Sequence, residues 1–173
     1  MQKTKTGNSL EEKLVAIKEL GDKKEEASFK LLLTSLESED PRILLDAIAA
    51  LDKFKAMPGA VSGGYAHQTA NDTRVVKPFV KLMNMKNILV RLAVINQIDK
   101  FRDEDVFQTL LGALKDRSSL VRTRAVEILS DWDISRCEDD LKKTLESERN
   151  KKVRKALIKA LKREGRKNPA GCL

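Results

Sequence analysis

Histidine and cysteine are scarce in this sequence of 173 residues, which contains one histidine and two cysteines. A metal centre needs several imidazoles, thiolates or carboxylates that converge on one point, and His67 alone cannot supply them. Cys137 and Cys172 lack the Cys-x-x-Cys spacing of zinc and thiol redox sites, and so few cysteines indicate a reducing compartment. No nucleophile and base can be paired around a single histidine either. We therefore expect no catalytic residues, no metal and no cofactor.

Long apolar runs are also missing. No stretch has the length and apolarity of a membrane span, and the N-terminal MQKTKTGNSLEEK lacks the apolar core of a secretory signal. From these two absences we expect a cytoplasmic protein that makes no contact with membranes.

Aromatic residues make up only 4% of the sequence, whereas 41% of it is hydrophobic, mostly leucine, isoleucine, valine and alanine. Strands favour β-branched and aromatic residues, so this composition suits packed helices better than sheets. A chain near this length buries roughly 70% of its unfolded surface, so its core needs no disulfide or metal. The composition predicts an all-α protein.

What the sequence does contain is an internal repeat. One pattern of apolar residues, which we call the apolar frame, recurs in four segments that begin at positions 43, 90, 121 and 153. The distances between successive segments are 47, 31 and 32 residues. Its members are Ile43, Ala47, Leu51 and Phe54; Val90, Val94, Ile98 and Phe101; Val121, Ala125, Leu129 and Trp132; and Val153, Leu157 and Leu161. A second frame lies between these segments and keeps the same period. The long first step of both frames is interpreted as one repeat plus an insertion. Two interleaved helices per period predict an α-solenoid (superhelix) of about four helix pairs with an N-terminal half repeat.

The repeat predicts a single domain over residues 1–173. Residues 1–8 and 166–173 are expected to be flexible. The insertion is expected to form a loop over residues 55–71, which contain three glycines and one proline.

Helix boundaries follow from capping residues and helix breakers. The first helix is expected to begin at Ser9, with Glu12 completing a capping box, and to stop at Gly21. Pro78 predicts a kink or a late helix start. Asp40 is the expected cap of the helix that begins at Pro41. The helices after the first are expected at 24–37, 41–54, 73–84, 86–101, 103–115, 118–132, 135–147 and 149–165.

The segment from Val121 to Leu129, VRTRAVEIL, carries the pattern V-R-x-x-A-V-x-x-L, and Val90-Arg91 and Val153-Arg154 repeat its beginning. On these residues the sequence resembles HEAT repeats over nearly all of 9–165. It is most similar to the short HEAT-like class first associated with phycobilisome lyase subunits. The resemblance implies a solenoid that binds other molecules.

The resemblance also implies a ladder of ion pairs, because in this family an acid near the turn between two helices often meets an arginine six places later. Asp116 with Arg122 and Glu148 with Arg154 have this spacing. Met85 stands six places before Arg91, so we expect the ladder to be broken in the first two repeats.

The positive charge is confined to the C-terminal end. The net charge is +8, yet residues 149–173 hold ten Lys or Arg against Glu164 alone, which is +9, and residues 1–148 sum to −1. On the last helix a stripe about 80° wide is expected to be basic. It consists of Lys151, Lys155, Lys159, Lys162 and Arg166. The equivalent positions in earlier repeats are neutral to acidic, or apolar at Leu45 and Leu92.

Three hypotheses for function follow. The first is a non-enzymatic protein-interaction scaffold that holds a protein partner of unknown identity on its inner-helix face, while the basic last helix steers an acidic region of that partner. The second is a nucleic-acid-binding module that uses residues 149–167. HEAT-like DNA glycosylases make this class possible, but a groove for nucleic acid is expected to be positive along its length. The third is an accessory subunit, a lyase or chaperone of the phycobilisome type.

Candidate partner-binding residues come from the inner-helix face and the inserted loop. Leu45 and Leu92 are either apolar anchors for the partner or are covered by the loop 55–71. Tyr65 and His67 lie in this loop, which is either a plain connector or a recognition loop. The complete set on the inner-helix face is Leu45, Leu92, Asp99, Glu127, Lys151, Lys155, Lys159, Lys162 and Arg166.

Overall fold

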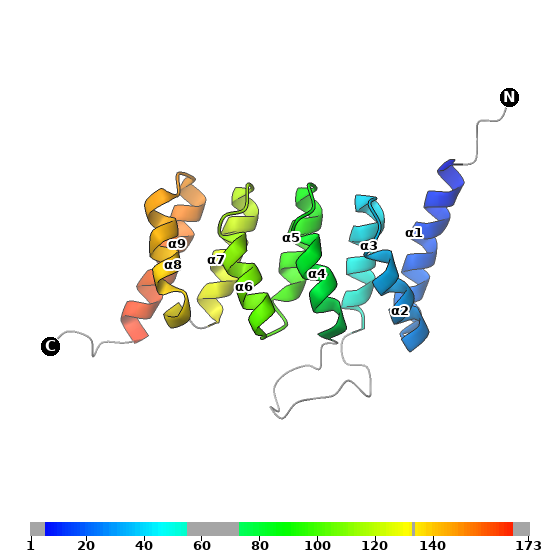
Figure 1. Cartoon of the computed structure of the whole chain (residues 1–173), viewed down its shortest axis with the longest axis horizontal. Helices are drawn as coiled ribbons and strands as arrows, with labels where there is room; N and C mark the ends of the chain where they lie inside the picture. Colours follow the sequence, from blue (N-terminus) through cyan, green and yellow to red (C-terminus); the bar gives the residue numbers. More distant parts are fainter. Residues whose placement is uncertain (1–5, 55–72, 133, 168–173) are drawn as a thin grey trace. The chain divides into compact units, whose positions relative to one another are not determined.

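The computed structural model describes residues 6–54, 73–132 and 134–167, with side chains placed for residues 10–163 of these ranges (Figure 1). All regular elements in this part of the chain are helices, which confirms the all-α prediction. The α-helices are α1 (Thr6–Lys23), α2 (Glu26–Ser35), α3 (Pro41–Asp52), α4 (Val76–Leu82), α5 (Ile88–Ile98), α6 (Glu104–Ala113), α7 (Ser119–Asp131), α8 (Glu138–Ser147) and α9 (Lys151–Lys167). Two short 3-10 turns, Thr73–Val75 and Ile134–Arg136, precede α4 and α8. The predicted loop 55–71 lies outside the described residues.

The chain divides into two compact units, Met1–Phe101 with α1 to α5 and Arg102–Leu173 with α6 to α9. Each even-numbered helix packs against the odd-numbered helix that follows it. Consecutive odd-numbered helices also pack on one another, α1 on α3 and α3 on α5 in the first unit and α7 on α9 in the second. The described helices thus form four sequential pairs preceded by α1, as the repeat predicts.

The predicted apolar frame forms most of the core. Ala47, Val94, Ala125 and Leu157 occupy equivalent positions of the four odd-numbered helices α3, α5, α7 and α9, and each is 0% exposed. Three members of the frame, Ile43, Trp132 and Leu161, are only partly buried. In α3, Leu44 is fully buried in place of Ile43.

The first helix differs from its prediction at both ends. α1 begins at Thr6, so Ser9 lies inside the helix and the predicted capping box is wrong. A cap is worth about 1 kcal/mol, which does not fix a boundary where the preceding residues can also be helical. α1 also continues through Gly21 to Lys23, and Lys24, with φ 51°, takes the left-handed conformation after its end. At Gly21 a Cβ would lie 2.9 Å from Cβ of Ala50, so the glycine permits close approach of α1 to α3.

Side-chain caps set the beginnings of the later odd-numbered helices. The carboxylate of Asp40 accepts a hydrogen bond from the main-chain N–H of Arg42, and Pro41 is the first residue of α3, as predicted. Asn87 and Ser118 cap α5 and α7 in the same way. Pro78 lies in the first turn of α4, which begins at Val76 and not at residue 73, so the late start is confirmed.

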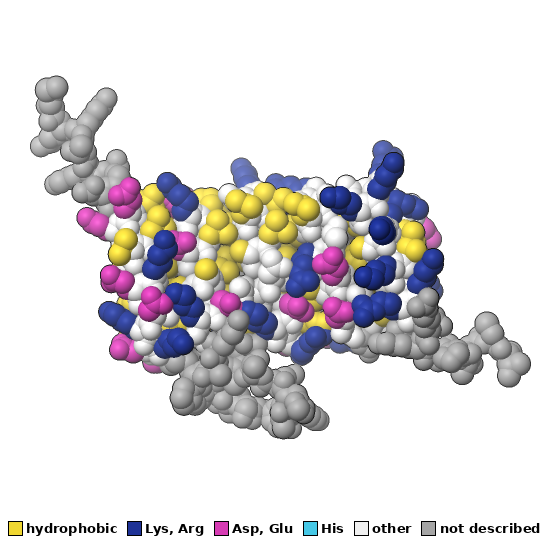
Figure 2. All heavy atoms as spheres, turned by 180° about the vertical axis from the view of Figure 1, so that it is seen from behind, with side chains coloured by type: hydrophobic (Ala, Val, Ile, Leu, Met, Phe, Trp, Pro, Cys, Tyr) yellow, Lys and Arg dark blue, Asp and Glu magenta, His cyan; other side chains and the backbone are white. Residues whose placement is uncertain are grey.

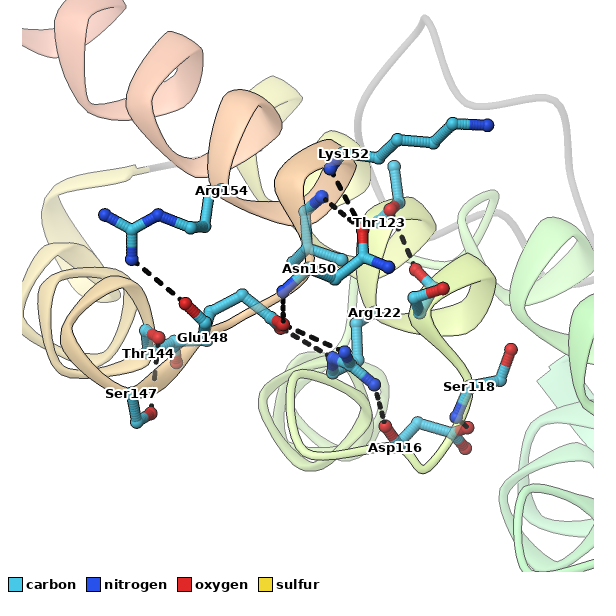
Figure 3. A network of polar contacts seen from close by, with 12 residues as sticks. Asp116, Ser118, Arg122, Thr123, Thr144, Ser147, Glu148, Asn150, Lys152 and Arg154 are labelled. Atoms are coloured by element: carbon cyan, nitrogen blue, oxygen red, sulfur yellow. Dashed lines mark hydrogen bonds and ion pairs between the residues drawn. The ribbon is translucent and has the colours of Figure 1, made fainter.

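Buried or partly buried arginines hydrogen-bond to the turns that precede these helices, but not as predicted (Figure 3). Nη1 of Arg122 donates to the main-chain carbonyl of Asp116 at 2.8 Å, and Nη1 of Arg154 donates to that of Glu148 at 3.0 Å. The contact six places back is therefore with the backbone. Nη1 of Arg91 makes the same backbone contact, to the carbonyl of Met85 at 2.8 Å, although residue 85 carries no acid.

The carboxylate that meets Arg122 comes from the next repeat. Nε and Nη2 of Arg122 donate to the two carboxylate oxygens of Glu148 at 2.7 and 3.0 Å. The same carboxylate accepts from the main-chain N–H of Asn150 at 2.7 Å. The Arg122 hydrogen bonds lower the pKa of Glu148 below its ordinary value, and those to Glu148 raise the pKa of Arg122. Glu148 therefore links α7 to the turn between α8 and α9.

Ion pairs join the C-terminal ends of neighbouring odd-numbered helices within each unit. Lys53 pairs with Asp22, 31 residues earlier, and Arg163 pairs with Asp131, 32 residues earlier. Lys100 pairs with Asp52 across a separation of 48 residues, which spans the insertion. These separations reproduce the repeat period and the insertion that the sequence predicted.

One further arrangement recurs in both units, at the N-terminal ends of α2 and α6. Arg74 lies over the ring of Phe29, with its guanidinium carbon 4.4 Å from the ring centre, and pairs with Glu26. In the second unit, Arg136 lies 4.1 Å from the ring centre of Phe107 and pairs with Glu104. In each case the arginine belongs to the 3-10 turn that begins the next repeat, so it ties adjacent repeats together.

Candidate functional site

Apart from the two candidates of the loop 55–71, the predicted site residues belong to the odd-numbered helices and the turns that end them. Figure 2 shows the protein from behind the view of Figure 1. Hydrophobic side chains gather over α3 and α5 in the first unit, and lysine and arginine side chains gather over α9 in the second. The two units therefore present surfaces of different chemical character.

In the first unit, α3 and α5 carry an exposed apolar cluster. Leu45 and Leu92 occupy equivalent positions of these two helices and are both partly exposed. Leu89, one turn before Leu92 on α5, is 57% exposed. Asp99 is the C-cap residue of α5 and is partly buried. We define Leu45, Leu89 and Leu92 as the leucine cluster.

In the second unit, the basic stripe on α9 faces solvent. Lys151, Lys155, Lys159 and Lys162 are all exposed, whereas Val153, Leu157 and Ala160 on the opposite side of the helix are buried. The side chain of Arg166 lies outside the described residues. Within the described part of the chain, these four lysines have no ion-pair partner.

A groove of about 410 Å³ runs between α7 and α9. It contains three of the predicted residues, Glu127, Lys155 and Lys159, but neither Lys151 nor Lys162. The sequence reasoning missed several residues of its lining. The full lining is Thr123, Arg124, Val126, Glu127, Ser130 and Asp131 from α7 and Lys152, Lys155, Ala156, Lys159, Ala160 and Arg163 from α9.

The missed residues of α9 follow from its helical geometry. Seen along the axis, Lys155 and Lys159 are shared by the predicted stripe and by the groove, and Lys152 and Arg163 lie further round toward α7. The stripe is centred on the side of α9 opposite the core. The apolar pattern of the α9 sequence alone is enough to identify that side. Which flank of α9 meets α7 depends on how the two helices pack, and the sequence pattern of α9 alone does not contain this information.

A second groove, of about 820 Å³, is lined by α6, α8 and the turns beside them. Its lining includes Leu111, Lys115 and Lys143, together with the Arg122 and Glu148 pair. Both members of this pair are mostly buried and are fully engaged with one another and with the backbone. We therefore interpret this part of the second groove as structural.

The architecture agrees with the outcome of comparisons with known proteins. A family model of HEAT repeats matches residues 66–130, which include α4, α5 and α6 and nearly all of α7. HEAT repeats are therefore present over residues 66–130. No curated protein matches the sequence significantly. HEAT repeats imply the α-solenoid class, are generally non-catalytic and commonly mediate protein binding.

The matched residues include the α6 and α7 sides of the two grooves, whereas α8 and α9 follow the end of the match. Tyr65 and His67, the candidates in the inserted loop, lie outside the described residues. No group of three or more His, Cys, Asp or Glu side chains suitable for a metal occurs among the residues that the structure describes. Within the same residues, no helix is long and apolar enough to cross a membrane.

Proposed function

We propose that this HEAT-repeat protein is a non-catalytic scaffold that holds a protein partner on the exposed side of its odd-numbered helices. The observation that carries this proposal is the leucine cluster of α3 and α5. A single exposed leucine on a protein surface needs no explanation. Here two equivalent positions of packed neighbouring helices, Leu45 and Leu92, are apolar and partly exposed, and the 57% exposed Leu89 extends them.

The repeat position of Leu89 carries a leucine again in the second unit. Leu89 is the second residue of α5, and Leu120, which is 53% exposed, is the second residue of α7. The buried core of each helix is complete without these two side chains, since Val90 and Val121 next to them are 0% exposed. Apolar side chains that the fold does not need are typical of the centres of protein interfaces.

In this proposal the lysines of α9 supply the charge that steers an acidic region of the partner. Surface charges of this kind mainly raise the rate of association, and their effect decreases with salt. Nucleic acid is the competing ligand, and the α9 lysines favour it. The acidic side chains Glu127 and Asp131, which lie in the groove beside these lysines, disfavour a phosphate backbone at the same place.

Site-specific photo-crosslinking in the native cell tests the proposal. A photoreactive residue in place of Leu89 or Leu92 is expected to crosslink to the same protein. The matched control is Leu31, which is 55% exposed but belongs to the even-numbered helix α2. The proposal is wrong if Leu31 yields the same adducts as Leu89, or if the adducts of Leu89 and Leu92 are nucleic acid.

A further inference from the structure

The groove between α7 and α9 has a base of small or buried side chains and charged sides. Val126 is 1% exposed and Ala160 is 2% exposed. Ala156 and Ala160 leave room beside α9 because their side chains are short, and the resulting space is about 410 Å³. This volume accommodates a few side chains of a bound chain and is much smaller than a whole helix or domain.

The charges of the groove are only partly neutralised within the protein. Its lining includes five cations and two anions. The anions are already engaged, since Asp131 lies 3.0 Å from Nη1 of Arg163 and Glu127 lies 3.5 Å from Nη1 of Arg124. The three remaining cations, Lys152, Lys155 and Lys159, have no ion-pair partner among the described residues. The α9 side of the groove therefore carries an uncompensated charge of +3.

We propose that the α7–α9 groove binds an acidic peptide segment of a partner protein, with carboxylates of the segment on Lys152, Lys155 and Lys159. This inference rests on the scaffold function proposed above and specifies the chemistry of one of its contacts. The three lysines are spaced i, i+3 and i+7 on α9, which extends over about 10 Å along the helix axis. Acidic residues two apart on an extended chain are about 7 Å from one another, so two or three of them span this distance.

The α7 side of the groove distinguishes a peptide from a nucleic acid. The side chains of Glu127 and Asp131 are 53% and 60% exposed, so both remain available to further donors. A polypeptide supplies main-chain N–H groups for these carboxylates as well as acidic side chains for the lysines. A nucleic-acid backbone is a continuous anion, which these carboxylates would repel at short range.

Charge-matched substitutions on α9 test the inference. The groove variant is Lys155→Gln with Lys159→Gln, and the control is Lys151→Gln with Lys162→Gln. All four lysines are exposed and belong to the same helix, but only the first pair lines the groove. Both variants lose two positive charges, so they differ only in where the charge is removed. Circular dichroism and thermal melting of each variant report whether the fold is retained.

The probe is a fluorescent peptide of alternating glutamate and alanine, about twelve residues long, measured by fluorescence anisotropy with the full-length protein at low salt. We expect the groove variant to raise Kd about three- to tenfold, as the loss of one or two exposed charge contacts predicts. The control variant is expected to change Kd less than twofold, and the same peptide with glutamine in place of glutamate is not expected to bind.

Three results would overturn the inference. They are no binding of the glutamate peptide up to about 1 mM protein, an equal loss of binding in both variants, or tighter binding of an oligothymidylate of the same length. These outcomes are separable from failure of the scaffold function. If Leu89 crosslinks to a protein but the groove substitutions leave the Kd of the peptide unchanged, the scaffold function is retained and the binding of an acidic segment in the groove is rejected.

Discussion

Removal of the Glu148 charge is the most direct test of how the repeats are held together. In Glu148→Gln the side chain keeps its shape but no longer neutralises Arg122, which donates to both of its carboxylate oxygens at 2.7 and 3.0 Å. The side chains of Arg122 and Glu148 are only 18% and 6% exposed. The substitution therefore leaves a mostly buried guanidinium without the carboxylate to which it donates.

The expected loss of stability lies between two known limits. Breaking a fully buried ion pair costs about 3–5 kcal/mol, whereas an exposed pair contributes about 0.2–1 kcal/mol. Because Arg122 and Glu148 line the groove beside α6 and α8, water reaches the pair after the substitution. Arg122 also keeps its bond to the carbonyl of Asp116. We therefore expect a loss of about 2 kcal/mol in the free energy of unfolding.

Urea unfolding, followed by far-UV circular dichroism, measures this loss. The matched control is Glu138→Gln, which breaks an ion pair with Lys142 whose side chains are 41% and 55% exposed. An i,i+4 pair on a helix surface contributes about 0.5 kcal/mol or less. Equal losses in the two variants would refute the conclusion that burial makes the Arg122 and Glu148 pair important.

The pH dependence of the same variant provides an independent check. The pKa of Glu148 is lowered in the folded state, chiefly by its hydrogen bonds from Arg122. Its stabilising contribution is therefore present above the unfolded pKa of about 4.3 and is lost as the pH falls through the lower folded value. The difference in stability between wild type and Glu148→Gln is expected to decrease below pH about 4.3. A difference that stays constant down to the acid-unfolded state would contradict this cause.

Two further predictions concern local packing and charge. Gly21→Ala is expected to destabilise the protein by about 1–3 kcal/mol because its Cβ would lie 2.9 Å from Cβ of Ala50. By contrast, Gly112→Ala on α6 meets no atom within 4 Å and is expected to stabilise it by up to about 1 kcal/mol; thermal or urea unfolding decides whether the two signs differ. The carboxyl group of Asp40 is expected to titrate by NMR with a pKa of about 2, mainly because of its hydrogen bonds with the Arg42 side chain. Arg42→Ala is expected to raise this pKa toward 3.8, and an unchanged pKa would show that the main-chain cap is its cause.

The repeat can be recognised from sequence because each odd-numbered helix buries the same face in the same way. Positions such as Ala47, Val94 and Leu157 are apolar for a reason that does not depend on the details of their neighbours, so the frame predicts the core and the helix pairs. The cap at Asp40 and Pro41 is equally local and equally predictable. The prediction of a cap at Ser9 is wrong because a local preference of about 1 kcal/mol does not decide where an exposed helix begins.

Contacts between repeats are not predictable in this way. The expected ladder pairs side chains six residues apart, yet the arginines reach main-chain carbonyls within their own turn, and Arg122 finds its carboxylate in Glu148, 26 residues later. Gly21 indicates a helix stop because glycine commonly ends helices, although here it makes room for Ala50. For both Arg122 and Gly21, the residue that explains the position belongs to a neighbouring repeat.

Composition and periodicity are enough to predict the all-α fold, the helix pairs and the basic character of α9. Each of these features depends on which residue types follow one another in the sequence and not on how two particular helices pack. The packing of α7 against α9 determines which flank of α9 faces α7, and therefore which lysines share the groove with Glu127 and Asp131. That choice is a relation between the surfaces of two helices, and no single helical pattern specifies it.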